Sequence, residues 1–224
     1  MRALTFQTAI LMLFSWPVQS ETLFCEASEV TVTASGVREA RLACGAAAHA
    51  KTLFESCNIP AITRPLRIGV VEDLKPSCFG QYHCGEDRIE LLSLPAMQAQ
   101  LLPDSAYARL SDEAFFKSIV VHELTHAAIE NMPCPFKTCL VAHEYLAYVM
   151  QVMSLSPEAK RQFIKGVDLE REISRDELNP FMYFMAPDRF ARKAWMHFTQ
   201  RDDPCGFVGQ IVDGTVLLDY ERFE

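Results

Sequence analysis

The chain has 224 residues, of which half are hydrophobic and 22% are charged, and its formal net charge is -8. This length suits one domain, and the apolar content is sufficient for a hydrophobic core and excludes wholesale disorder. Because the chain is acidic and contains no run of lysine and arginine, a nucleic-acid partner is excluded, and a soluble polypeptide or small molecule is expected instead.

The N-terminus has the pattern of a secretory signal peptide. Arg2 precedes an almost wholly apolar run from Ala3 to Trp16, and Val18-Gln19-Ser20 resembles the residues before a cleavage site. The apolar run is too short to span a bilayer well. We therefore expect cleavage near Ser20, one mature domain over residues 21–224, a secreted or periplasmic location, no membrane span and a monomer.

All eight cysteines lie after the expected cleavage site: Cys25, Cys44, Cys57, Cys78, Cys84, Cys134, Cys139 and Cys205. An even number of cysteines in an exported chain indicates four disulfides, whose connectivity the sequence leaves open. Two short loops would close easily, Cys78 with Cys84 and Cys134 with Cys139. No paired C-x-x-C spacing is present, so a cysteine-based zinc site is not expected.

The first half of the chain mixes strands with a helix. Alternating polar and β-branched residues predict a strand over 29–33, and apolar residues three and four apart predict a helix over 37–57. Leu66–Val71 is a second expected strand. Residues 73–87, rich in proline, glycine and charge, are expected to form a loop pinned by a disulfide. Arg88–Leu92 is a third, short strand.

The second half is predicted to be mainly helical, which gives an α+β fold. One helix is capped by Ser111 or Asp112 and continues to about Asn131. Others are expected over about 138–154, from Pro157 onward, and from Pro187 to about Gln200. The last twenty residues are expected to form turns and a strand.

The central helix contains His122-Glu123-Leu124-Thr125-His126, an H-E-x-x-H motif. Residues four apart on a helix are neighbours, so both imidazoles can reach one metal ion. Glu123 is rotated about 100° from the first histidine, where it can act as a general base on a water molecule that zinc activates. These residues predict a Zn²⁺ site with Glu123 as the catalytic residue.

This motif, following the strand Arg88–Leu92, resembles the zincin superfamily of zinc metallopeptidases over residues 66–154. The resemblance implies that an edge strand lies beside the motif helix and pairs with an extended substrate. Arg88–Leu92 would be that strand. Metzincin-like proteins continue the motif with glycine and histidine, but Ile129 and Met132 occupy those positions here, so that subgroup is excluded.

The third metal ligand is less clearly defined by the sequence. Gluzincin-like proteins place a glutamate on the following helix, often as E-x-x-A, and Glu144-Tyr145-Leu146-Ala147 lies eighteen residues after His126. The resemblance thus implies Glu144 as the ligand. His143 and Asp219 remain alternatives, and helical periodicity fits Glu144 both as a cleft residue and as a solvated one beside Gln151.

Further residues have possible supporting roles. Glu130, one turn after His126, could orient that ring. Tyr145, Tyr148 or His197 could stabilise the oxyanion of a tetrahedral intermediate, and His143 could lie near the metal. An aromatic cluster is expected in the hydrophobic core: Phe181, Tyr183, Phe184 and Phe190.

The expected function is zinc-dependent hydrolysis of peptide bonds in a peptide or protein substrate. Two alternatives stay open at this stage. One is a non-catalytic zincin-like shell that retains its metal for structure or for a partner. The other is a disulfide-stabilised interaction domain without metal.

Overall fold

The computed structural model describes residues 20–26, 28–76 and 78–220, and its strands form a five-stranded sheet in the order β1-β2-β3-β5-β4. The expected signal peptide lies outside these residues, apart from Ser20. Strands β2, β3 and β5 are parallel, whereas β1 and β4 are antiparallel strands at the two edges. The strand bounds are β1 (Glu21–Phe24), β2 (Val30–Ala34), β3 (Leu66–Val71), β4 (Gly80–His83) and β5 (Arg88–Leu92).

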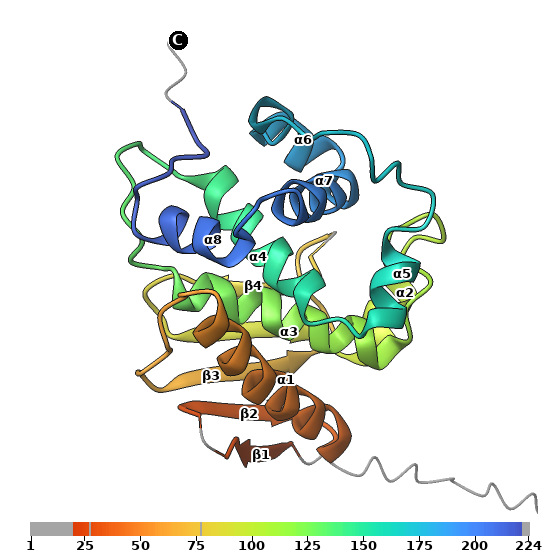
Figure 1. Ribbon diagram of the computed structural model, residues 1–224. Coiled ribbons are helices and arrows are strands. Elements are labelled where there is room, and N and C mark those ends of the chain that lie inside the picture. The colour runs from red at the N-terminus through yellow and green to blue at the C-terminus, as the bar shows by residue number, and fades with distance from the viewer. Residues whose placement is uncertain (1–19, 27, 77, 221–224) are drawn as a thin grey trace, which may run out of the picture.

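Eight α-helices accompany the sheet in the described part of the chain, so the predicted α+β class is confirmed. Most of them follow the sheet in sequence, and the C-terminal half is helical (Figure 1). Their bounds are α1 (Val37–Ser56), α2 (Leu94–Gln100), α3 (Asp112–Ala128), α4 (Leu140–Met153), α5 (Pro157–Phe163), α6 (Pro180–Met185), α7 (Pro187–Thr199) and α8 (Pro204–Val212), with a 3₁₀ turn at Arg175–Glu177.

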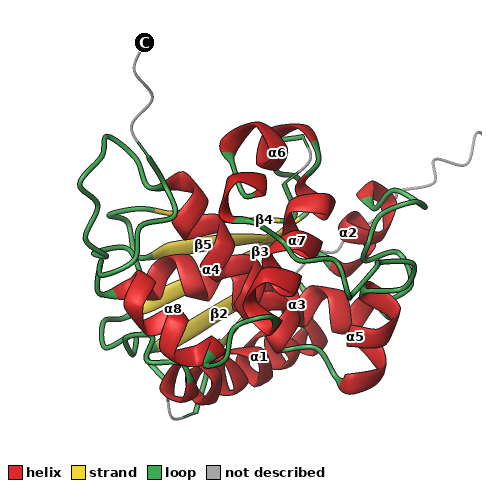
Figure 2. Ribbon diagram, turned by 45° about the horizontal axis from the view of Figure 1, so that its top comes forward, coloured by secondary structure: helices red, strands yellow, loops and turns green. Residues whose placement is uncertain are grey.

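Helix α3 is central to the fold. Its predicted start is confirmed, because the Ser111 hydroxyl accepts the Ala114 N–H at 3.3 Å. The helix packs against α1 and α4 and against strands β4 and β5. Figure 2 shows the sheet behind α3 and α4. Side chains on all sides of α3 are therefore buried, including Phe116, Val121 and His122, which point in three different directions around the helix.

Two predictions about the sheet are wrong. The segment 73–87 is not only loop, because it contains β4, which pairs with β5 from Gly80↔Leu91 to His83↔Arg88. Consequently β5 is an interior strand, and β4 is the edge strand beside α3. The strand signal of β4 is weak in sequence, since only Tyr82 of its four residues is a strong strand former.

The C-terminal segment also differs from its prediction. Residues expected to form turns and a strand contain α8, which starts at Pro204 with the Asp203 carboxylate accepting the Gly206 N–H at 2.9 Å. An aspartate cap followed by proline at the first helical position is a helix start signal, and it outweighs the two glycines inside α8.

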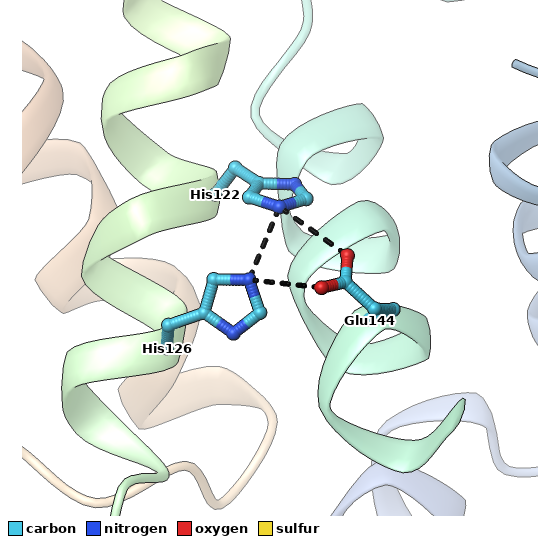
Figure 3. A group of neighbouring side chains, drawn as sticks. All are labelled: His122, His126 and Glu144. Carbon is cyan, nitrogen blue, oxygen red and sulfur yellow. Dashed lines mark hydrogen bonds and ion pairs between the residues drawn. The ribbon is translucent and has the colours of Figure 1, made fainter. Parts of the chain in front are cut away.

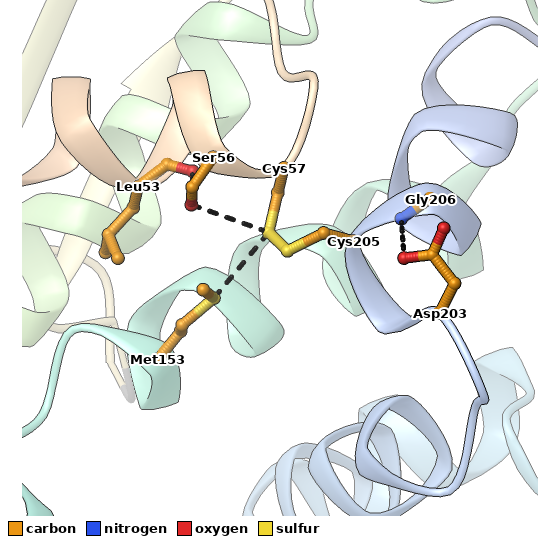
Figure 4. The surroundings of a disulfide bond; sticks show 7 residues. All are labelled: Leu53, Ser56, Cys57, Met153, Asp203, Cys205 and Gly206. Carbon is orange, nitrogen blue, oxygen red and sulfur yellow. Dashed lines mark hydrogen bonds between the residues drawn. A yellow bond between two sulfur atoms is a disulfide. The ribbon is translucent and has the colours of Figure 1, made fainter.

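Six of the eight cysteines form three disulfides: Cys25–Cys44, Cys57–Cys205 and Cys134–Cys139. The Cys57–Cys205 bond joins the end of α1 to the start of α8, and the Cys57 sulfur lies 3.8 Å from the Met153 sulfur of α4 (Figure 4). The expected Cys134–Cys139 pairing is confirmed. The three bonds are compatible with an extracellular location.

The expected Cys78–Cys84 pairing is wrong, because both thiols are free. The two cysteines flank β4. Four extended residues alone span about 13 Å, whereas disulfides require Cα atoms closer than about 7 Å. The intervening strand therefore holds the two sulfurs apart.

None of the helices among the described residues is both long and apolar enough to cross a membrane.

Candidate metal centre

Helices α3 and α4 bring His122, His126 and Glu144 together, as Figure 3 shows. The Nε2 atoms of the two histidines are 3.2 Å apart. One oxygen of Glu144 lies 3.7 Å from Nε2 of His122, and the other lies 3.8 Å from Nε2 of His126. The two histidines share a face of α3 because they are one turn apart, and Glu144 faces them from the first half of α4.

These distances fit a tetrahedral zinc ion. Two ligand atoms that each lie 2.0–2.1 Å from such an ion are about 3.3 Å from one another. The three observed separations lie between 3.2 and 3.8 Å. Two imidazole nitrogens and one carboxylate also match the ligand set of a catalytic zinc site, which keeps one coordination position for water or substrate.

Burial sets the protonation state of the three candidate ligands. It lowers the pKa of His122 to about 4, against a smaller opposing effect of the Gln151 hydrogen bond, and it holds the pKa of His126 well below its usual range. Both rings are thus neutral at pH 7, the form that binds metals. Burial also raises the pKa of Glu144 to about 7, and a hydrogen bond from the Tyr183 hydroxyl opposes that rise.

Glu123 lies beside the ligands but takes no part in the group of three. Its side chain is buried, and its Oε2 atom accepts the backbone N–H of Tyr82 at 2.7 Å. Burial raises the pKa of Glu123 to about 8; the Tyr82 N–H opposes the rise, and the charge of Glu144 adds to it. A carboxyl with a pKa near neutrality is suited to proton transfer.

The site opens into a cleft of about 1260 Å³. Strand β4 contributes Gly80 and Tyr82 to its lining, and α6 contributes Tyr183 and Phe184. Small-molecule pockets usually measure about 300–1,000 Å³, so this cleft has room for an extended chain.

The model of the family of unknown function DUF6639 matches residues 30–221 of this chain. The chain belongs to the DUF6639 family. No curated protein and no solved structure shows a significant match to it. The match covers the whole of the metal-ligand group, so the candidate centre lies within the DUF6639 region.

The two alternative ligands of this DUF6639 chain do not join the group of three. His143 stacks its ring 6.3 Å, centroid to centroid, from that of His126 and lines the cleft. Both carboxylate oxygens of Asp219 accept backbone N–H groups of α4, from Val141 and Ala142 at 2.9 Å each. Asp219 therefore caps α4, whose own N-cap residue, Cys139, makes no side-chain cap bond.

The prediction that Glu130 orients His126 is wrong. One oxygen of Glu130 accepts from Arg64 Nη2 at 2.9 Å, and the other accepts the Gly85 N–H at 2.6 Å. The physical reason is that α3 ends at Ala128, so Glu130 no longer follows the helical spacing that would place it beside His126.

A residue that the sequence does not single out, Gln151, contacts His122 instead. Its Oε1 atom accepts from Nδ1 of His122 at 3.0 Å, and its side chain is fully buried. Gln151 lies two turns after Glu144 on α4, and that spacing could have suggested a common face with the metal ligands. The solvated interpretation of this stripe is wrong for Gln151.

The candidate oxyanion residues separate into two groups. The Tyr148 ring packs edge-on against His122 with centroids 4.7 Å apart and lines the cleft, so it remains a candidate. In contrast, the Tyr145 hydroxyl lies 3.0 Å from Nδ1 of His197 in a buried pair, and neither residue lines the cleft.

The aromatic cluster is core only in part. Phe190 is fully buried as expected, but Phe181 and Phe184 are exposed. Tyr183 lines the cleft and bonds to Glu144. The six-residue helix α6 buries none of its side chains, so most of its aromatic residues face outward or into the cleft.

Proposed function

We propose that this DUF6639 chain is a zinc-dependent hydrolase of peptide bonds with a zincin-like site. The observation that carries the proposal is the convergence of His122, His126 and Glu144 at zinc-ligand spacing with Glu123 beside them. A purely structural zinc site is usually closed by four protein ligands and needs no adjacent general base.

Glu123 and Tyr148 have separate roles in the proposed hydrolysis. A bound zinc ion would supply Lewis acidity toward a water molecule and the substrate carbonyl. Glu123 takes the proton of the attacking water and then delivers it to the nitrogen of the leaving amine. The Tyr148 hydroxyl, whose pKa burial holds well above its usual range, stays protonated and can donate to the developing oxyanion.

The edge strand supports a polypeptide substrate. The Phe79 carbonyl oxygen accepts the Leu92 N–H of β5. Because backbone hydrogen bonds in an antiparallel pair occur at every second residue, the backbone N–H and C=O groups of Gly80 and Tyr82 point away from β5. The Tyr82 N–H follows this rule, since it reaches Glu123. The other outward groups, the Gly80 N–H and the carbonyl oxygens of Gly80 and Tyr82, can pair with an extended peptide, which would lie across the metal centre.

We further propose that the protein acts outside the cytoplasm, either secreted or in a periplasm. The three disulfides support an oxidising compartment. The signal-like pattern of residues 1–20 supports export.

The test compares wild-type protein with Glu123→Gln. We expect both to hold one zinc ion per chain by elemental analysis, while hydrolysis of a fluorogenic peptide library falls at least about 100-fold in the variant, because the glutamine cannot accept the proton. Glu158→Gln, at an exposed glutamate of α5, is the matched control and should keep full activity.

Two results would contradict the proposal. A wild-type protein that binds zinc but cleaves no member of the library would instead be a non-catalytic metal-binding module. A wild-type protein that takes up no zinc would refute the metal centre as well.

A further inference from the structure

A chain of three hydrogen bonds leads from the metal-ligand group into the core. His122 Nδ1 lies 3.0 Å from Gln151 Oε1, and Gln151 Nε2 lies 3.3 Å from the Ser118 hydroxyl. The Ser118 hydroxyl lies 2.7 Å from the Phe115 carbonyl oxygen. Gln151 and Ser118 have no exposed surface, so water cannot replace any of these partners.

The Phe115 carbonyl, at the end of this series of hydrogen bonds, determines which group donates in each of them. A carbonyl oxygen only accepts, so at 2.7 Å the Ser118 hydroxyl must donate to Phe115. The Ser118 oxygen is then an acceptor for Gln151, which fixes the amide with Nε2 toward the serine. If the Gln151 amide were flipped, the Ser118 hydroxyl would have to donate to Gln151 instead. The Ser118 and Phe115 oxygens would then lie 2.7 Å apart with no proton between them.

The fixed amide determines the tautomer of His122. Gln151 Oε1 can only accept, so Nδ1 of the neutral imidazole must carry the proton. The lone pair is then on Nε2, the atom that lies 3.2 Å from His126 Nε2 and 3.7 Å from Glu144. The ring is also held in place from α4, on the side opposite the candidate metal position.

We propose that Gln151, supported by Ser118, is a positioning residue that holds His122 in the Nδ1-protonated tautomer and directs its Nε2 lone pair at the metal. The inference rests on the metal centre of the proposed function but not on peptide hydrolysis. Removing an outer partner of a metal-binding histidine typically weakens metal affinity 10–100-fold.

The experiment measures zinc affinity by competition with a chromophoric chelator. Gln151→Leu removes both bonds of the amide and should weaken zinc binding 10–100-fold. Ser118→Ala is milder and should weaken it a few-fold. Tyr145→Phe is the matched control, because it removes another buried hydrogen bond of α4, the one to His197, and should change zinc affinity less than about twofold.

A second measurement keeps the inference independent of zinc and of catalysis. In the metal-free protein, ¹⁵N NMR should show His122 with its proton on Nδ1 at neutral pH, and Ser118→Ala should introduce the other tautomer. Wild-type His122 protonated on Nε2, or unchanged zinc affinity in folded Gln151→Leu, would overturn the inference. A protein with the expected tautomer and affinity changes but no peptidase activity would refute only the proposed reaction.

Discussion

Glu123 and Glu144 are both buried and line the same cleft, and neither forms an ion pair with lysine or arginine in the described residues. Glu144 contacts the rings of His122 and His126, but both rings are neutral at pH 7 and supply no positive charge. Two carboxyl groups without a compensating cation are unfavourable in a low-dielectric interior, and their pKa values rise. A divalent cation would offset both charges, which agrees with the ligand geometry.

A different buried residue provides a prediction for pH dependence. Burial lowers the pKa of His197 from 6.5 to about 4, with a smaller effect from Arg201. At this residue the unfolded chain therefore binds more protons than the folded chain between these values, so the contribution of His197 to stability is full above pH 6.5 and is lost on acidification toward pH 4. By pH 5 the loss of unfolding free energy at His197 is on the order of 2 kcal/mol, since one unit of pKa difference corresponds to about 1.4 kcal/mol.

Urea unfolding of the metal-free protein at several pH values between 7 and 5 measures this loss. His197→Gln can still hydrogen-bond to Tyr145 but cannot take up a proton, so between pH 7 and pH 5 its unfolding free energy should rise relative to that of the wild type. Parallel pH dependences of the two proteins would show that His197 does not contribute.

At the scale of elements, the pairing of β4 with α3 determines where Glu123 lies. A Cβ atom at Gly80 would lie 2.8 Å from both Cγ and Oε1 of Glu123, closer than real contacts allow. The glycine therefore lets the edge strand approach the helix closely enough for the Tyr82 N–H to hold the carboxylate.

Gly80→Ala should displace Glu123 while leaving the three metal ligands in place. We expect peptide hydrolysis to fall about 10–100-fold, because small misplacements of a catalytic group have effects of that size, and zinc affinity to stay within about twofold. Gly45→Ala in α1 is the control, since nothing lies within 4 Å of its added Cβ. The control should keep full activity and gain up to about 1 kcal/mol in stability. Full activity in Gly80→Ala would show that Glu123 does not need this close approach.

The sequence predicts the long elements and the local motif better than the contacts between distant segments. Helices α1, α3, α4, α5 and α7 and strands β2, β3 and β5 agree with their predicted positions to within a few residues, because periodic apolar residues and caps are local signals. Strand β4 was not predictable in this way, since its place depends on pairing with β5 and on contact with Glu123.

The same distinction applies to the site. His122, Glu123 and His126 are apparent from their spacing alone. Glu144 was named through a family resemblance, and the structure places it beside both histidines. The spacing of Gln151 from Glu144 indicates a common face of α4, but its contact with His122 is tertiary, and no local pattern reveals the capping role of Asp219.

At the scale of the whole molecule, the disulfides close loops of very different length. Cys57–Cys205 spans 148 residues of sequence, whereas Cys134–Cys139 spans 5. A cross-link restricts the unfolded chain more when its loop is longer, by about 5 kcal/mol for the first bond and about 2 kcal/mol for the second in the chain-entropy model.

Replacing each pair with alanines should therefore have unequal effects. The double variant at Cys57 and Cys205 is expected to lose more unfolding free energy in urea than the double variant at Cys134 and Cys139. Equal losses would show that local contacts of the sulfurs, and not loop length, determine the stabilisation.

The long loop has another consequence. His122, Glu123, His126 and Glu144 all lie between Cys57 and Cys205, and so does the segment that joins α5 to α6. If an environmental protease cleaved the backbone once in that segment, the Cys57–Cys205 disulfide would still join the two fragments. The nicked molecule would thus retain every metal-binding group on one larger fragment, with α8 still anchored to α1.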